Sequence, residues 1–136
     1  MAQTAFIKLV PASNKQCITL DEVKELFTYY KAITTKTGKQ LDWQYEGAAF
    51  PYILKETEEG KGKWFYLKCS NDQRYNLIAV GVSEKHEQPA YIQITLPDGA
   101  TFGDKGKANE FCKFLGKKLQ GELQLFNGRI MYFYKR

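Results

Sequence analysis

The alternation of apolar and polar positions divides the chain into strand-like and helix-like segments. Residues 5–10 are β-prone and are followed by Pro11, which predicts a first strand. Apolar residues then recur at helical spacing as far as Gly38, behind a capping-box pattern of Thr19 and Glu22. This spacing predicts an amphipathic helix that lies on a sheet and ends at Gly38.

The middle of the chain has the two-residue period of β-strands. We expect strands near residues 41–45, 48–54, 63–69, 75–82 and 91–96. The segments 64–67 and 77–80 are apolar on both faces, which predicts interior strands that are covered on both sides. Pro51 lies between two aromatic residues, a context that leaves the isomer of its peptide bond open.

The last third of the chain predicts a second helix and a hairpin. The helix should begin at Asp104, a good N-cap residue, and run to about Gln120. Asn127-Gly128 suits a two-residue type I′ turn in which Phe126 lies opposite Arg129. The order of elements predicts an α+β fold, namely a two-layer sandwich of a mostly antiparallel sheet, two amphipathic helices packed on it and a C-terminal β-hairpin.

The predicted hairpin has two apolar faces. The face that we expect in the core carries Leu123, Leu125, Ile130, Tyr132 and Tyr134. The other face carries the candidate interface residues Phe126, Met131 and Phe133. Together with Trp64 and Tyr66, these residues form more apolar surface than a sheet covered on one side needs, so either another part of the chain or a partner should cover it.

Composition predicts one folded domain over residues 1–136. The chain is 43% apolar and 15% aromatic, well above the level of disordered chains. No run approaches the ~18 apolar residues of a membrane span, and the first residues lack a basic segment followed by an apolar one. The three cysteines are scattered and odd in number, which does not suggest a disulfide framework. We therefore expect a cytoplasmic protein with no membrane association.

The net charge of +5 is concentrated in the C-terminal half of the chain. Residues 1–60 have a net charge of −1, whereas residues 61–136 have a net charge of +6. Such an asymmetry fits either an anionic partner or a solubilising surface. The candidate anion- or nucleic-acid-binding residues are Lys105, Lys107, Lys113, Lys117 and Arg129. Whether they form one face depends on where the hairpin lies, which the pattern leaves open.

The start of the second helix is rich in glycine and lysine. Such a helix N-terminus presents N–H groups to phosphate. A Walker A loop, however, would need glycine at position 101 and Ser or Thr at 108, where this chain has Thr101 and Ala108. Asp104 would also cap the same N–H groups and repel an anion, so ordinary helix capping is the favoured interpretation.

The chain has no recognisable set of catalytic or metal-binding residues. His86 is the only histidine, and no pair of cysteines has ligand spacing, so we expect no metal and no cofactor. Cys69 or Cys112 would act as a nucleophile only if the fold brought it to His86. The carboxylates available as acids or bases are Asp42, Glu46 and Asp104. Nothing in their spacing brings them together.

Three segments together resemble a small uncharacterised family of Bacillus-type bacteria. They are residues 23–30 of the first helix, residues 107–111 (KANEF) and residues 123–129 (LQLFNGR). The resemblance extends over the whole chain and implies a compact α+β domain with no assigned activity. It transfers no catalytic or binding residue to this sequence.

The function predicted from these observations is a non-enzymatic binding or protein-interaction module. Its partner would be another protein or a second copy of the chain, bound through the apolar face of the hairpin. The alternative is a nucleic-acid or phosphate binder that uses the basic C-terminal half. An enzyme acting on a small molecule remains a third hypothesis, which would require a pocket where the carboxylates or tyrosines converge.

Overall fold

The computed structural model describes residues 3–40, 52–58, 63–69, 74–83 and 89–134 of the chain. Its elements are, in chain order, β1 (Gln3–Lys8), α1 (Leu20–Gln40), β2 (Ile53–Lys55), β3 (Trp64–Lys68), β4 (Leu77–Val82), β5 (Tyr91–Leu96), α3 (Phe102–Leu119), β6 (Glu122–Gln124) and β7 (Ile130–Tyr132). The predicted strands at 41–45 and most of 48–54, together with Pro51, lie outside the described residues.

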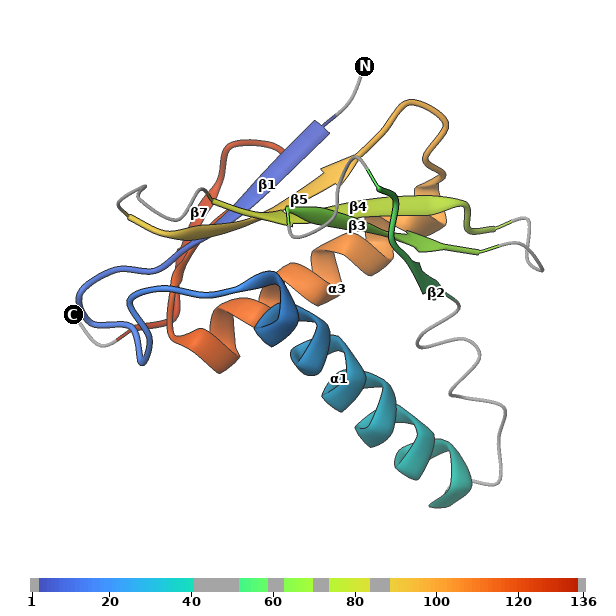
Figure 1. The fold of residues 1–136 in the computed structure, drawn as a ribbon, viewed down its shortest axis with the longest axis horizontal. Coiled ribbons are helices and arrows are strands. Elements are labelled where there is room, and N and C mark those ends of the chain that lie inside the picture. Colours follow the sequence, from blue (N-terminus) through green and yellow to red (C-terminus); the bar gives the residue numbers. More distant parts are fainter. Residues whose placement is uncertain (1–2, 41–51, 59–62, 70–73, 84–88, 135–136) are drawn as a thin grey trace.

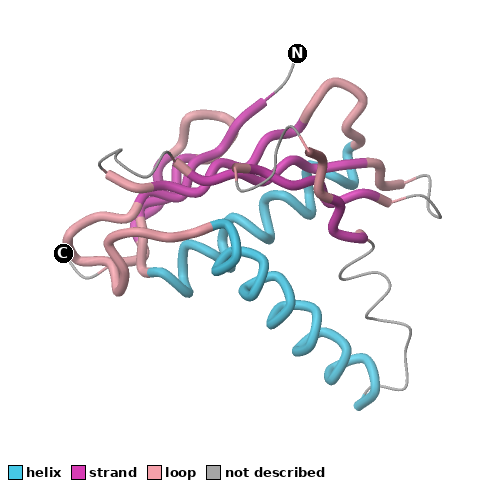
Figure 2. The backbone as a smooth tube through the Cα atoms, viewed as in Figure 1, coloured by secondary structure: helices cyan, strands magenta, loops and turns pink. Residues whose placement is uncertain are grey.

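The described strands form one antiparallel sheet with both helices on the same side (Figures 1 and 2). The strand order is β2-β3-β4-β5-β1-β6-β7, and every pair is antiparallel. The chain therefore begins in the middle of the sheet and ends at one edge, with the C-terminal hairpin beside β1. The predicted α+β sandwich is confirmed.

The core lies between the sheet and the two helices. Alternate residues of each interior strand are fully buried, as Ile7, Phe65 and Ile94 show, because a strand points successive side chains to opposite faces. The helices contribute Phe27 and Phe111, whose rings meet edge to face with centroids 5.3 Å apart. This contact joins α1 to α3, and the ring of Phe27 also packs against Phe65 at 6.0 Å.

The start of α1 follows the prediction, but its end does not. The Thr19 Oγ1 accepts a hydrogen bond from the Glu22 N–H at 3.2 Å, and the Glu22 carboxylate accepts one from the Thr19 N–H at 3.1 Å. This is the predicted capping box. The helix continues through Gly38 to Gln40, since one glycine costs a helix only about 1 kcal/mol and does not end it.

The N-cap of α3 is Thr101, so the prediction of Asp104 as the cap is wrong. The Thr101 side chain accepts a hydrogen bond from the Asp104 N–H at 3.0 Å, and the Asp104 carboxylate accepts one from the Thr101 N–H at 2.9 Å. Asp104 is thus the third helical residue, in a capping box with aspartate where glutamate is usual. The helix ends at Gln120, which has a left-handed φ of 53°.

The C-terminal hairpin is present, but its register is one residue away from the predicted one. Leu123 pairs with Met131, and the turn is closed by hydrogen bonds from Leu125 N–H to the Arg129 carbonyl and from Gly128 N–H to the Leu125 carbonyl. A type I′ turn needs two residues with positive φ, and here only Gly128 has one, at 86°. The turn is therefore a longer one with a glycine bulge, and the faces of β7 are exchanged.

The prediction that β3 and β4 are covered on both sides is also wrong for the described part of the chain. Phe65, Leu67, Ile78 and Val80 are fully buried, whereas the residues between them are only partly buried. Both strands are interior in the sheet, but α1 and α3 cover one face alone (Figure 1). We refer to the other face as the open face.

Candidate functional site

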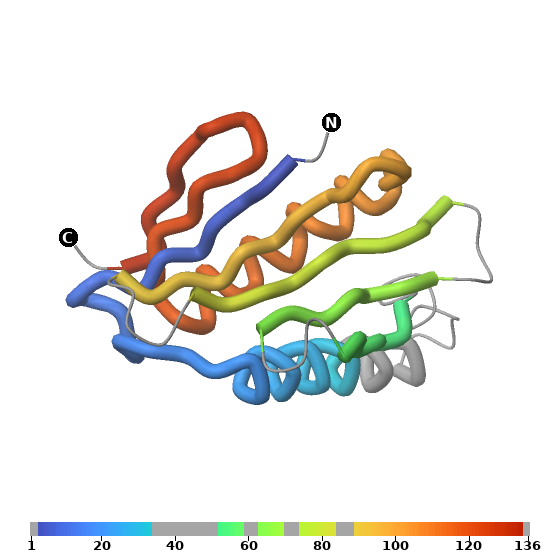
Figure 3. Tube along the Cα trace, turned by 45° about the horizontal axis from the view of Figure 1, so that its top comes forward, coloured from blue at the N-terminus to red at the C-terminus, as the bar shows by residue number. Residues whose placement is uncertain are grey.

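The open face of the sheet is rich in aromatic side chains. Figure 3 views the backbone of the sheet with this side turned forward. Residues directly opposite each other on paired strands share a face, so the pairs Trp64–Gly81, Gly81–Gln93, Gln93–Phe6 and Phe6–Gln124 define one row across it. The aromatic residues of the open face are Phe6, Trp64, Tyr66, Tyr91 and Tyr132. All five are at least partly exposed.

A hollow of about 330 Å³ lies on this face above β4. Its floor contains Ala79 and Gly81, whose small side chains leave the space. Trp64 and Tyr66 line it from β3, and Gln93 and Thr95 line it from β5. The hollow therefore has an aromatic wall on one side and a wall of amide and hydroxyl groups on the other.

The polar wall is ordered by contacts within the sheet. The Gln93 side-chain amide donates a hydrogen bond to the Thr95 hydroxyl at 3.3 Å, and this hydroxyl lies 3.4 Å from that of Thr4 on β1. These distances are at the long end of the hydrogen-bond range. The groups are therefore oriented by their neighbours and retain capacity for a further partner, because a hydroxyl has two lone pairs and an amide has two donors.

The open face is basic on the side of β2 and β3. The strands β2, β3, β4 and β5 contain Lys55 and Lys68 and no carboxylate. Lys63 stands one residue before β3 and lines the hollow. Towards the other edge of the sheet the charges balance, because Lys8 on β1 lies directly opposite Glu122 on β6. The cations thus gather on the same side as the aromatic wall.

Asp104 occupies a different and fully enclosed place on the opposite side of the sheet. Its carboxylate accepts hydrogen bonds from the Tyr52 hydroxyl at 2.6 Å and from the N–H groups of Asn76, Leu77 and Thr101 at 2.9–3.1 Å. The residue has no exposed surface. Because the carboxylate accepts all of these hydrogen bonds, it holds the start of α3 against β4. Because it is fully buried, a substrate cannot reach it.

The other candidate reactive groups are also buried or undescribed. Cys112 is on α3 and is fully buried in the core of the protein. Burial raises the pKa of its thiol to about 12, so it is not a thiolate nucleophile. Cys69 is buried in the core cluster. His86, Asp42 and Glu46 lie outside the described residues. Among the described residues, no group of histidine, cysteine and carboxylate side chains has the arrangement of a metal site.

The basic residues predicted for nucleic acid do not share one element. Lys105, Lys107, Lys113 and Lys117 are on α3, and Arg129 is exposed in the turn of the hairpin. Lys107 forms an ion pair with Glu110 at 3.2 Å and has a side chain only 13% exposed. Lys113 and Lys117 are exposed neighbours one turn apart. Their role in anion binding stays a prediction.

The candidate interface residues Phe126, Met131 and Phe133 are packed against the core rather than turned to solvent. The one-residue change of register moves Met131 to the side of Leu123. The ring of Phe133 lies on Gly116 of α3, within 2.8 Å of where a Cβ of that glycine would stand. The exposed apolar residues of β7 are instead Ile130 and Tyr132, at 45% and 43%. The predicted assignment of faces is therefore wrong for β7, whereas Leu123 and Leu125 are on the core side as predicted.

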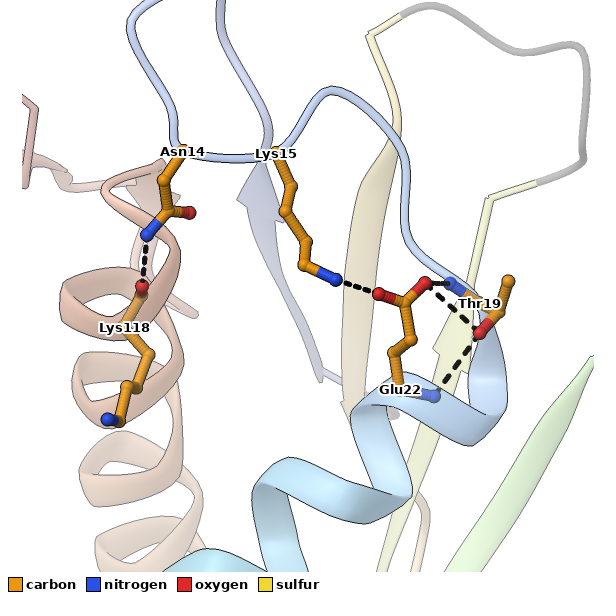
Figure 4. A network of polar contacts seen from close by, with 5 residues as sticks. All are labelled: Asn14, Lys15, Thr19, Glu22 and Lys118. Atoms are coloured by element: carbon orange, nitrogen blue, oxygen red, sulfur yellow. Dashed lines mark hydrogen bonds and ion pairs between the residues drawn. The ribbon is translucent and has the colours of Figure 1, made fainter.

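A second hollow, of about 300 Å³, lies between the start of α1 and the end of α3. The Asn14 side chain donates a hydrogen bond to the Lys118 carbonyl at 2.8 Å, and Lys15 pairs with Glu22 beside the capping box (Figure 4). The Lys118 ammonium lies 4.3 Å from the centre of the Tyr29 ring. The charged groups here bind each other, and their contacts fasten the segment before α1 to both helices.

A third hollow, of about 620 Å³, lies at the turn between β5 and α3. Phe102 and Lys105 line it, and the Phe102 side chain is 96% exposed. The adjoining helix N-terminus is already used, since Thr101 caps it and also donates a hydrogen bond to the Arg74 carbonyl at 2.6 Å. The geometry here favours capping over anion binding.

Comparison with known proteins gives a family and no activity. A profile described as Domain of unknown function (DUF1885) matches residues 3–135. The chain belongs to this family. A crystal structure described as a protein of unknown function from Bacillus stearothermophilus resembles the DUF1885 chain with 45% identity and a TM-score of 0.60, over 88% of this chain and 92% of that one. No curated protein is significantly similar.

These findings confirm the resemblance to an uncharacterised family and leave the function of this DUF1885 chain to be argued from its geometry. None of the described helices is long and apolar enough to cross a membrane. Of the residues that line the hollow on the open face, Trp64 and Tyr66 were noted from the sequence as surplus apolar surface, whereas Gln93, Thr95 and the small residues of β4 were missed. The available signal was the pair of small residues at alternate positions of β4, Ala79 and Gly81, opposite the aromatic positions of β3.

Proposed function

We propose that this DUF1885 protein is a binding module that takes its partner on the open face of the sheet. The observation that supports this most is the set of partly exposed aromatic side chains on strands in the interior of the sheet. Trp64 and Tyr66 lie on β3, between β2 and β4, on the face that neither helix covers. Aromatic side chains presented in this way are enriched where proteins bind partners.

A binding role is favoured over catalysis by the lining of the hollow. Among the described residues that line it, none is a carboxylate, histidine or cysteine, and these are the groups that most often transfer protons or attack a substrate. The described carboxylate with the most enclosed environment, Asp104, is engaged by five donor contacts and lies elsewhere. The groups of the open face are suited to stacking, hydrogen bonding and charge attraction.

The fluorescence of Trp64 tests the proposal directly. The chain has two tryptophans, so a Trp43→Phe background leaves Trp64 as the only reporter. We expect that at least one of three partners will protect Trp64 from quenching by iodide and acrylamide. The partners are a mixed-sequence single-stranded oligonucleotide, polyglutamate as an acidic polypeptide, and the protein itself at rising concentration.

Protection of Trp64 by any of these would support the open face as a binding surface. The control is a Phe102→Ala variant, which removes a 96% exposed ring outside the hollow on the open face and should leave the protection unchanged. If quenching of Trp64 is the same with all three partners as without them, the proposed function is overturned.

A further inference from the structure

We infer that the hollow above Ala79 and Gly81 is a subsite for one base of a single-stranded nucleic acid. This inference rests on the proposed function and names the partner of that surface. It differs from the basic patch predicted from the sequence, because it uses the open face of the sheet and none of the lysines of α3.

The shape of the hollow suits a single planar ring system. Its volume of about 330 Å³ is at the lower end of the range for small-molecule sites. The floor is formed by β4, where Gly81 has no side chain and Ala79 has only a methyl group. A Cβ at Gly81 would meet the Lys63 carbonyl oxygen at 3.2 Å and the Trp64 Cβ at 3.4 Å. The absence of a side chain therefore lets β3 and its aromatic wall lie close to the floor.

The two walls offer the two interactions by which proteins hold unpaired bases. Trp64 and Tyr66 provide aromatic faces for stacking, which every base can use. Gln93 and Thr95 provide an amide and a hydroxyl that can meet the hydrogen-bonding edge of the same base. An unpaired base exposes both its faces and its edge, whereas in a duplex the faces are stacked and the pairing edge is occupied.

The charge around the hollow suits a phosphate backbone. Lys63 lines the hollow, Lys55 lies directly opposite Tyr66, and Lys68 follows Tyr66 on the same face of β3. The strands β2 to β5 contain no carboxylate. Lys68 is oriented by a hydrogen bond of 2.7 Å from its ammonium to the Asn76 side chain. Cations placed along aromatic rings in this way are the usual combination in surfaces that bind single strands.

A second ring continues the surface across the sheet. Phe6 lies in the same cross-strand row as Trp64, with Gly81 and Gln93 between them. The Phe6 ring is held edge to face by Tyr91, with centroids 5.4 Å apart. A base further along the same nucleic-acid strand would find its stacking partner here, on a ring whose orientation is already set.

The test is titration of a fluorescein-labelled, mixed-sequence single strand of about 12 nucleotides, with the matching duplex and with polyglutamate as competitor. We expect the single strand to bind more tightly than the duplex. Trp64→Ala and Tyr66→Ala should each weaken binding by roughly ten- to a hundred-fold. The conservative Trp64→Phe variant should retain most of the affinity, which separates loss of stacking from loss of folding. Phe102→Ala, which removes an exposed ring outside the hollow, should leave the affinity unchanged.

The lysines are tested by the dependence of binding on salt. Lys55→Gln with Lys63→Gln should reduce the slope of log affinity against log salt by about 1.4, which is about 0.7 for each lysine. The matched control, Lys113→Gln with Lys117→Gln on α3, should leave the slope unchanged. If only the α3 pair changes the slope, the single strand binds elsewhere and the inference is overturned.

Two further outcomes would overturn the inference while leaving the proposed function standing. One is binding of the duplex or displacement by polyglutamate to the same extent as the single strand, which would mean charge attraction without base recognition. The other is protection of Trp64 by self-association or by polyglutamate with no binding of the oligonucleotide. Failure of every partner to protect Trp64 would remove both proposals together.

Discussion

The hydroxyl of Tyr52 donates a hydrogen bond of 2.6 Å to the carboxylate of Asp104, across 52 positions of the chain. This contact ties the segment before β2 to the first turn of α3. The same carboxylate accepts hydrogen bonds from the N–H groups of Asn76 and Leu77, where β4 begins. One buried side chain thus joins three segments that are far apart in the sequence, and its partners are mostly backbone groups.

Replacing Asp104 by asparagine should lower the free energy of unfolding by about 2–4 kcal/mol. The side chain keeps its size, but an NH₂ group would face the N–H donors of Asn76, Leu77 or Thr101, and the charge that strengthens these hydrogen bonds is lost. Tyr52→Phe should cost less, about 1–2 kcal/mol, because only one of the donors disappears. Urea denaturation of both variants would measure this, and equal stability of Asp104→Asn and the wild type would contradict the structural role.

Two glycines of α3 should respond to alanine with opposite signs. A Cβ at Gly103 would lie 2.2 Å from the Arg74 carbonyl oxygen, so Gly103→Ala must displace backbone and should destabilise by about 2–4 kcal/mol. A Cβ at Gly106 would meet nothing within 4 Å. Gly106→Ala should therefore stabilise by about 0.5–1 kcal/mol through helix propensity alone.

Thermal unfolding of the two variants gives the comparison. Both glycines belong to the glycine-rich start of the helix that resembles a phosphate site in the sequence, yet of the two only Gly103 has a packing reason to be glycine. If Gly103→Ala is tolerated as well as Gly106→Ala, the Arg74 carbonyl oxygen does not approach Gly103 as closely as the structure shows.

The features that the sequence predicted correctly are those that depend on residues close to one another in the chain. The capping box of Thr19 and Glu22 follows from their spacing, and strand 91–96 follows from alternation bounded by a turn. The failures have both local and distant causes. Asp104 looked like an N-cap because its capping box with Thr101 has aspartate where glutamate is usual. Nothing local shows that Tyr52 and the backbone at 76–77 would surround its carboxylate.

The hollow on the open face was hidden from the sequence because it depends on how distant strands pair. The segment Trp64-Phe65-Tyr66-Leu67 is apolar throughout, and such a run normally indicates two covered faces. Here the second set of apolar side chains is aromatic and partly exposed. The hollow depends on Gly81 and Ala79 of β4 lying opposite Trp64 and Tyr66, a register that no local pattern specifies.

The register of the hairpin can be tested with matched threonine substitutions on β7. In the observed register Met131 lies opposite Leu123 and packs against the core, whereas Ile130 is 45% exposed. Met131→Thr should cost about 1–2 kcal/mol of stability, and Ile130→Thr should stay within about 0.5 kcal/mol. The type I′ register expected from Asn127-Gly128 requires the reverse order, so chemical denaturation of the two variants distinguishes the registers.

Stability should fall in alkaline solution because of two buried groups. Burial raises the pKa of the Cys112 thiol to about 12, and burial together with the hydrogen bond to Asp104 raises the pKa of the Tyr52 hydroxyl above its ordinary value. In the unfolded chain a thiol titrates near ~8.5 and a phenol near ~10. Above those values the unfolded chain has released a proton that the folded chain retains, so unfolding becomes more favourable as the pH rises.

Each such group should contribute a decrease of about 1.4 kcal/mol in the free energy of unfolding per pH unit. The decrease caused by Cys112 begins near pH ~8.5 and that caused by Tyr52 begins near pH ~10. Below these pH values the stability that each group contributes is fully present. Cys112→Ala should therefore make the decline between about pH 9 and 11 shallower by about 1.4 kcal/mol per unit, and Tyr52→Phe should do so only above about pH 10. Urea titrations at half-unit steps measure both slopes, with Cys17→Ala, at an exposed cysteine, as the control. A slope for Cys112→Ala equal to that of the wild type would mean that the thiol is not buried in the folded protein.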